Sequence, residues 1–188
     1  MCILFIAVEA HPDYPLIVCA NRDEFHHRAT EPAYRWATTP IIIAGQDKQA
    51  GGTWLGINEQ GQFAGLTNIR AIEQQDGVRS RGELVVDALT KQHINSQWLT
   101  EHSINYNPFN LVFEQHNQLH CFNSKTLTTT LLKPGFHAVS NGALDDIWPK
   151  MAKGQQQLQS YIKQMQSPCI DQLLNIMRDT SQPKDQDL

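Results

Sequence analysis

Strand-like segments in this 188-residue chain fall into two groups that are separated by one helical segment. Short apolar runs bounded by turn residues indicate strands, whereas apolar residues recurring every three to four positions indicate helices. The first group of strands ends near residue 68, and the second group is followed by helices. The order of strands, helix, strands, helices predicts a layered α+β domain rather than alternating βαβ units.

The first group of expected strands begins with apolar runs at residues 2–8 and 16–20. The turn residues at 11–15 between them predict a hairpin. The stretch that contains Pro32 and Pro40 is expected to be a loop, because proline is rare inside strands. Further strands of this group are expected at 41–45, 51–58 and 61–68.

Two patterns predict where helices begin. Ser80 and Glu83 form a capping-box pattern, with the serine as N-cap, and Ser167 followed by Pro168 predicts the start of the last helix. The remaining elements expected from apolar periodicity are helices around 98–99 and at 147–165, and strands at 109–114, 119–122, 127–132 and 136–140.

Composition excludes several classes of protein. The formal net charge is −4 and no block of Lys or Arg occurs, so no nucleic-acid partner is expected. No apolar run approaches the roughly 20 residues of a membrane-spanning helix. The four cysteines are widely scattered, which argues against a zinc ribbon or thioredoxin motif and makes a reducing cytoplasm the expected compartment; they are Cys2, Cys19, Cys121 and Cys169.

Cys2 follows the initiator Met1 directly, and this position carries a specific chemical possibility. Removal of Met1 would leave a cysteine with both a thiol and a free α-amine. An α-amine has a pKa of about 8, so it acts as a base near neutral pH, and one residue would then hold nucleophile and base. The alternative interpretation is a small apolar residue in a buried strand. Position alone leaves both open.

Polar residues follow the second expected strand at the point where it would lie beside Cys2. If 2–8 and 16–20 pair as a hairpin, Arg22 and Asp23 come next to the cysteine. A guanidinium favours thiolate over thiol, and a carboxylate can orient a protonated amine. The alternative is a surface turn whose charges pair with each other.

Three asparagines lie at expected strand or turn ends, namely Asn58, Asn68 and Asn141. Side-chain amides in such positions can donate hydrogen bonds to a developing oxyanion. Asparagine is also simply a common turn residue, so this second interpretation stays open for each of them.

No metal or cofactor is expected. The candidate ligands between residues 11 and 27 do not follow a known spacing such as H-E-x-x-H, and the adjacent histidines cannot easily face one ion from one strand. They are His11, Asp13, Asp23, Glu24, His26 and His27.

Several short strings resemble one family, the NRDE family, which is also called the transport and Golgi organisation protein 2 family. The matches keep their order over residues 1 to about 150. They are Met1-Cys2-Ile3-Leu4, Ala20-Asn21-Arg22-Asp23-Glu24-Phe25, Ala50-Gly51-Gly52-Thr53-Trp54-Leu55-Gly56, Leu66-Thr67-Asn68, Ser80-Arg81-Gly82-Glu83-Leu84, Phe109-Asn110-Leu111 and Ser140-Asn141.

The resemblance implies a four-layer αββα sandwich of the N-terminal-nucleophile (Ntn) hydrolase type, with a more distant similarity to choloylglycine hydrolases and penicillin V acylases. It implies an amidohydrolase that cleaves a C–N amide bond of an N-acyl small molecule. Cys2 would be the nucleophile, with Arg22 and Asp23 tuning and orienting it. Asn68 and Asn141 would hold the oxyanion. The residues implied for substrate contact are Asn21, Asn58 and Thr67.

The same resemblance implies an alternative without catalysis. Family members are linked to secretory organisation, to lipid or acyl-CoA metabolism and to haem handling, so the fold could bind or traffic haem, acyl-CoA or lipid. Members of the family usually continue into strands that carry a Tyr-Gly-Thr-Arg-Ser-like motif. Residues 1–188 contain no such motif, and they are expected to form a single domain that lacks those carboxyl-terminal strands.

Overall fold

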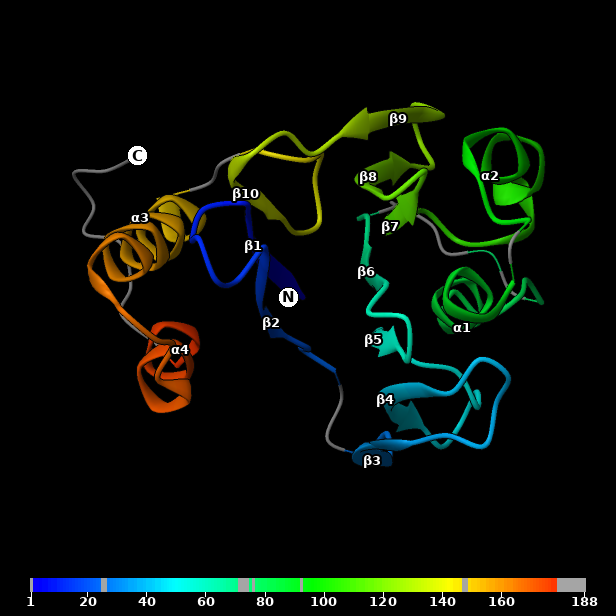
Figure 1. The fold of residues 1–188 in the computed structure, drawn as a ribbon. Helices are drawn as coiled ribbons and strands as arrows, with labels where there is room; N and C mark the ends of the chain where they lie inside the picture. Colours follow the sequence, from blue (N-terminus) through cyan, green and yellow to red (C-terminus); the bar gives the residue numbers. More distant parts are fainter. Residues whose placement is uncertain are drawn as a thin grey trace.

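The computed structural model describes residues 2–24, 27–70, 75, 77–91, 93–146 and 149–178. Figure 1 shows the arrangement of the described elements. In chain order they are β1 (Ile3–Val8), β2 (Leu16–Asn21), β3 (Thr30–Arg35), β4 (Ile42–Asp47), β5 (Leu55–Asn58), β6 (Phe63–Asn68), α1 (Gly82–Thr90), α2 (Ser96–His102), the 3-10 helix η1 (Ser103–Asn105), β7 (Phe109–Gln115), β8 (Gln118–Asn123), β9 (Thr128–Leu131), β10 (Gly135–Val139), α3 (Pro149–Gln164) and α4 (Ile170–Met177).

The strands form two antiparallel sheets. The smaller sheet has the order β10-β1-β2, and the larger has the order β3-β4-β5-β6-β7-β8-β9. β1 and β2 pair as the predicted hairpin, with Leu4 opposite Ala20 and Ile3 opposite Asn21. β10 pairs with the other edge of β1, with Val139 opposite Leu4. The first strand of the chain is therefore the central strand of its sheet.

The two sheets stack with helices on both outer faces, as Figure 1 shows. Successive side chains of β1 point to opposite faces of the small sheet, so they enter two different parts of the core. Phe5 packs against Leu158 of α3, whereas Leu4 lies between the sheets with Val112. On the far face of the large sheet, α1 and α2 cover a third cluster that includes Phe109. The α+β class predicted from the sequence is confirmed, and its layers follow the order helix, sheet, sheet, helix.

The stretch predicted as a loop contains an edge strand, β3, so that prediction is wrong. Pro32 lies in this strand, and the pairing with β4 shifts register between Glu31 and Tyr34. Because β3 is at the edge of the sheet, the missing N–H of proline costs no ladder hydrogen bond there. The buried Trp36, which directly follows β3, holds the end of this strand against β4, because its indole N–H donates to the carbonyl of Ala44 at 2.9 Å.

Both predicted helix caps are also wrong. The N-cap of α1 is Arg81, with no side-chain cap, and Glu83 accepts from Arg79 instead of completing a capping box. The N-cap of α4 is Cys169, whose N–H donates to the hydroxyl of Tyr161 at 2.7 Å. In each case a tertiary or neighbouring contact replaces the local cap. The predicted start of the preceding helix, at 147–148, lies outside the described residues, and α3 is described from residue 149.

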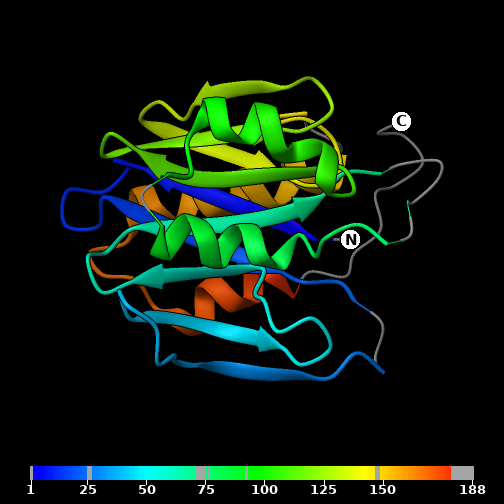
Figure 2. The ribbon, with the colours of Figure 1, turned by 90° about the vertical axis from the view of Figure 1, so that its right-hand side faces the viewer.

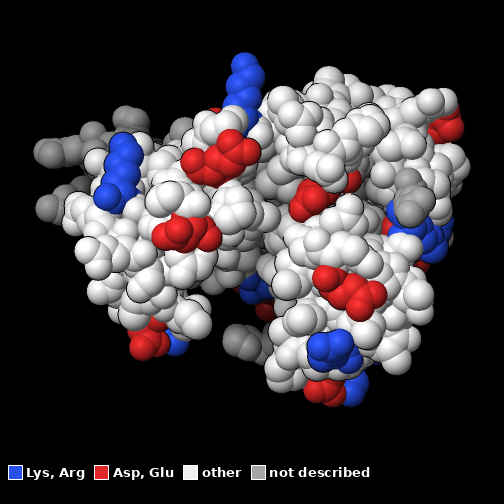
Figure 3. Space-filling view, viewed as in Figure 1, with Lys and Arg blue, Asp and Glu red and all other residues white. Residues whose placement is uncertain are grey.

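Within the described ranges, no helix is long and apolar enough to cross a membrane. All four cysteines are free thiols. On the face shown in Figure 3, acidic and basic side chains are interspersed rather than gathered into one basic patch.

Candidate functional site

Cys2 lies immediately before β1, and its side chain is half-buried. The alternation that places Leu4 between the sheets assigns Cys2 to the same face of the strand. Its thiol lies 3.9 Å from the main-chain carbonyl oxygen of Asp23. Its own carbonyl oxygen accepts a hydrogen bond of 2.8 Å from the hydroxyl of Ser140. The hairpin therefore brings residues 22–24 beside Cys2, as the sequence predicted.

A cavity of about 560 Å³ opens beside Cys2. Its walls come from the loop after β2, the turn after β4, the end of β6 and the segment that enters α1. Figure 2 shows the start of β1 on the same side of the molecule as the segment leading into α1. Four arginines and two acidic residues line this cavity, namely Arg22, Arg28, Arg79, Arg81, Glu24 and Asp47.

Arg22 and Arg28 are held by the two acids of the cavity wall. Arg28 donates through Nε to Asp47 at 2.8 Å, and Arg22 lies 3.8 Å from the same carboxylate and 3.6 Å from Glu24. The guanidinium of Arg22 also stacks over the ring of Trp54, 4.6 Å from its centroid. Burial opposes ionisation of Asp47, but its hydrogen bonds from Arg28 and from backbone N–H groups dominate and lower its pKa.

Arg81 differs from these two arginines, because it forms no ion pair with any residue in the described part of the chain. One of its terminal nitrogens donates to the carbonyl of Pro108 at 3.2 Å. Burial lowers the pKa of Arg81, and the positive charge of Arg28 adds to this effect. The sequence prediction missed this residue, although it lies in the matched string at residues 80–84 and follows the predicted cap Ser80.

The protonation of Cys2 is set by competing influences. Burial raises the pKa of the thiol. The positive charges of the amino terminus, Arg22 and Arg81 act in the opposite direction, while the carboxylate of Glu24 supports the rise. Because the net result is a raised pKa, the thiol is protonated at neutral pH and needs a base to become a nucleophile.

Asn68 and Asn141 meet at one end of the sheets. The side-chain amide of Asn141 donates to the main-chain carbonyl of Asn68 at 2.7 Å. Asn68 lines the cavity of Cys2, whereas Asn141 is not among its lining residues. The structure thus brings together two of the residues predicted for an oxyanion site, with one of them at the cavity wall.

Asn21 and Asn58 are placed away from the cavity. Asn21 donates to the carbonyl of Met177 at 2.7 Å, on the side of β2 that faces α4. Asn58 is buried in the β5–β6 turn, where its amide donates to the carbonyl of Leu89 at 3.0 Å and its oxygen accepts from the N–H of Gln62 at 2.9 Å. Neither Asn21 nor Asn58 is among the residues that line the cavity of Cys2.

Thr67 is buried in a polar network that holds the backbone of Cys2. Its hydroxyl donates to the carbonyl of Ser140 at 2.6 Å. The amide of Asn110 donates to the same carbonyl at 3.2 Å and to the carbonyl of Gly142 at 2.7 Å. Ser140 in turn donates to the Cys2 carbonyl, so the large sheet fixes the start of β1. Thr67 therefore bonds to Ser140 and is not among the residues that line the cavity.

Sequence reasoning missed Ser140 and Asn110 as parts of this site. Asn110 is 1% exposed, and its oxygen has no hydrogen-bond partner among the described residues. A signal was present, because Asn110 interrupts the apolar run from Phe109 to Phe113. A polar residue inside such a run calls for buried partners, but the sequence does not say which ones.

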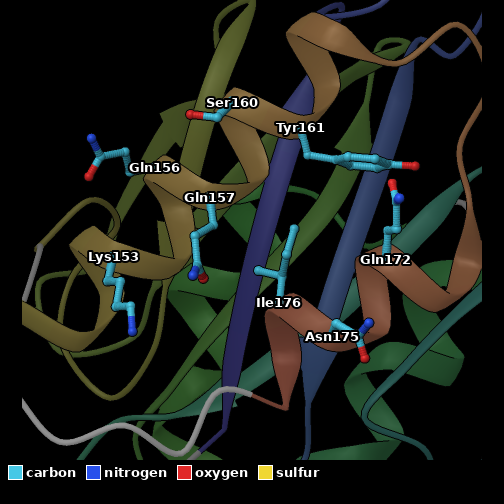
Figure 4. A pocket seen from close by; sticks show the side chains of 8 residues that line it. All are labelled: Lys153, Gln156, Gln157, Ser160, Tyr161, Gln172, Asn175 and Ile176. Carbon is cyan, nitrogen blue, oxygen red and sulfur yellow. The ribbon is translucent and has the colours of Figure 1, made fainter.

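A second cavity, of about 600 Å³, lies between α3 and α4. Figure 4 shows the ring of Tyr161 of α3 extending toward Gln172 of α4, with Gln157 of α3 and Ile176 of α4 beside each other. It shares no lining residue with the cavity of Cys2. No group of three or more His, Cys, Asp or Glu side chains in the described ranges could hold a metal ion. His26, one of the candidate ligands considered between residues 11 and 27, lies outside those ranges.

Comparison with known proteins identifies relatives along the whole chain. The mouse Transport and Golgi organization 2 homolog is 32% identical over 197 residues, which cover 94% of this chain and 71% of the relative. The bovine homolog is 34% identical over 172 residues, covering 83% of this chain and 62% of the relative. The family model described as Transport and Golgi organisation 2 matches residues 1–188. The chain belongs to the Transport and Golgi organisation 2 family.

Proposed function

We propose that this chain is a cysteine amidohydrolase of the N-terminal-nucleophile type, which cleaves the C–N bond of an N-acyl small molecule. The observation that carries the proposal is the position of Cys2 at the wall of a polar cavity, with Arg22 and Arg81 acting on its thiol and Ser140 holding its carbonyl. The relatives' names refer to transport and Golgi organisation, and we infer the same cellular setting for this chain.

The layer order supports the proposed fold type. Helices cover the outer faces of two stacked antiparallel sheets, and the residue at the start of the central strand of the small sheet faces the cavity. We assign this arrangement to an αββα sandwich of the Ntn-hydrolase type, in which residues 1–188 form one domain.

The proposed reaction begins once Met1 is removed. The α-amine of Cys2, with an ordinary pKa of about 8, takes the thiol proton. The sulfur attacks the amide carbon, and the carbonyl oxygen becomes an oxyanion. The resulting ammonium gives its proton to the leaving nitrogen as the C–N bond breaks, which leaves a thioester on Cys2. Water then attacks the thioester with the amine again as base, and the carboxylic acid leaves.

The neighbouring residues have distinct roles in this scheme. Arg22 and Arg81 stabilise the thiolate by their charge, which offsets part of the burial penalty. The side-chain amide of Asn68 donates to the oxyanion from the cavity wall. Asn141 is a positioning residue, because it holds the backbone of residue 68. Asp23 contributes its main-chain carbonyl, which orients the thiol.

The test compares Cys2→Ala and Cys2→Ser with the unsubstituted chain, all with Met1 removal verified by intact mass, on a panel of N-acyl amides. We expect hydrolysis to fall by at least about 100-fold in both variants, since nucleophile and base act on one centre. Cys169→Ser is the matched control, because this exposed thiol does not line the cavity.

Unchanged turnover in both Cys2 variants would rule out the proposal. If no amide is hydrolysed but haemin or an acyl-CoA binds saturably, a non-catalytic binding role replaces it. The two outcomes are separable in one set of protein preparations.

A further inference from the structure

We propose that the cavity beside Cys2 binds an amide that carries a single carboxylate, and that Arg81 is the residue that recognises this carboxylate. The inference rests on the proposed amidohydrolase function and deepens it by naming the substrate class. It is carried by the charge balance of the cavity wall and by the environment of Arg81.

Arg81 lies in an environment that leaves its charge without an anionic partner among the described residues. Its guanidinium is partly desolvated, yet it forms no ion pair with any residue that the structure describes, and it donates to the neutral carbonyl of Pro108. A charge withdrawn from water is costly unless it gains a partner. A guanidinium also has five N–H donors. Arg81 therefore has both the charge and the donors to bind an anion in the cavity.

The positive and negative side chains of the cavity wall do not balance. Arg22 and Arg28 are matched by the two acids of the wall, Glu24 and Asp47. Arg79 lies at the rim, half-exposed, and is paired with Glu83 of α1. Among the side chains of the described residues that line the cavity, this leaves one uncompensated positive charge, that of Arg81. A carboxylate with one negative charge neutralises the side chains of the wall.

The thiol of Cys2 is protonated in the resting site. Since burial raises the pKa of its thiol, Cys2 does not supply the missing negative charge in the resting site. Arg81 and Cys2 line the same cavity, so a small amide can reach both. A carboxylate is planar and accepts two parallel hydrogen bonds from a guanidinium. The amino terminus of α1, which begins directly after Arg81, adds a favourable dipole.

The experiment measures binding by calorimetry in the Cys2→Ala background, so that the ligand is not consumed. The probes are N-hexanoylglycine and its neutral counterpart N-hexanoylglycinamide. We expect the acid to bind about 10- to 100-fold more tightly, in line with a hydrogen-bonded ion pair. Arg81→Gln should remove this preference. Arg79→Gln is the matched control and should keep it within about twofold, because Arg79 is already paired.

Three results overturn the inference: equal affinity for the acid and the amide, a preference that survives in Arg81→Gln, or no saturable binding of either probe. Should Arg81→Gln fail to fold, Arg81→Lys serves instead and should show a reduced preference, since it keeps the charge but loses the planar pair of donors.

The test of carboxylate recognition can fail or succeed independently of the test of amide hydrolysis. A carboxylate preference in binding without any turnover by the unsubstituted, processed chain upholds the inference and refutes hydrolysis. Hydrolysis of neutral and acidic amides at equal rates, with no preference in binding, upholds hydrolysis and refutes the inference.

Discussion

The contact between Gly52 and the start of α1 offers a sharp test of how the cavity wall is held. A Cβ added at Gly52 would lie 2.6 Å from the carbonyl carbon of Gly82 and 2.8 Å from its oxygen. Both are backbone atoms, so no side chain can rotate away. The N–H of Thr53 also donates to that same oxygen at 3.2 Å. Gly52→Ala must therefore push α1 and the turn after β4 apart by most of an ångström.

We expect Gly52→Ala to lower the free energy of unfolding by about 2 kcal/mol, within the range known for overpacked sites. The displacement acts on Gly82, which is bonded to Arg81, so the carboxylate preference in binding should fall as well. Urea denaturation followed by circular dichroism measures the first effect, and calorimetry with N-hexanoylglycine measures the second.

Gly51→Ala provides the control. Gly51 has φ of +75° but open space around its Cβ position. Alanine there carries a backbone penalty of about 1 kcal/mol and leaves α1 in place, so stability should fall without loss of carboxylate preference. The reasoning is refuted if Gly52→Ala leaves both stability and binding unchanged, or if Gly51→Ala disturbs binding to the same extent.

Three further predictions follow from the contacts around the site. Thr67→Val removes a buried donor to Ser140 and should lower the free energy of unfolding by about 1–3 kcal/mol in urea denaturation; an unchanged midpoint would contradict it. The hydrogen bond with Asp145 raises the pKa of His137, so this stabilisation is present below about pH 6.5 and is lost as pH rises through the raised pKa. The unsubstituted chain should therefore exceed Asp145→Asn in unfolding free energy by about 0.5 kcal/mol more at pH 5.5 than at pH 8.5. An equal difference between the two proteins at both pH values would refute this. The rate at which iodoacetamide alkylates Cys2, followed by peptide mass spectrometry on chain that retains Met1, should still increase with pH above 9.0, because the pKa of the thiol is raised from its ordinary value of 9.0. A rate that stops increasing below pH 9.0 would contradict the raised pKa.

The parts of the fold that follow from local pattern were predictable. Apolar runs such as that of β1 and the turn residues after it predict a hairpin, and the hairpin alone brings Arg22 beside Cys2. Antiparallel neighbours such as β4, β5 and β6 depend on short connections, which the sequence shows. β3 was missed because Pro32 signals a break, and only its position at the sheet edge makes the strand tolerable.

The rest of the site depends on long-range packing. Ser140 reaches Cys2 only because β10 pairs with β1 across most of the chain length. Arg81 reaches the cavity because α1 packs its first residue against Gly52. Neither contact leaves a periodic signal in the sequence. The cap predicted at Ser80 fails for a different, local reason, since Glu83 bonds to the side chain of Arg79 rather than to a backbone group.

The central claim is that Cys2 acts with its own α-amine, and one measurement tests it most directly. Chain freed of Met1 and chain that retains it, both verified by intact mass, are incubated with a hydrolysable N-acyl amide and quenched in acid. The account predicts an acyl group on the Cys2 peptide, and turnover, in the processed chain alone. Equal hydrolysis by the form that retains Met1, or acylation at another residue, would contradict it.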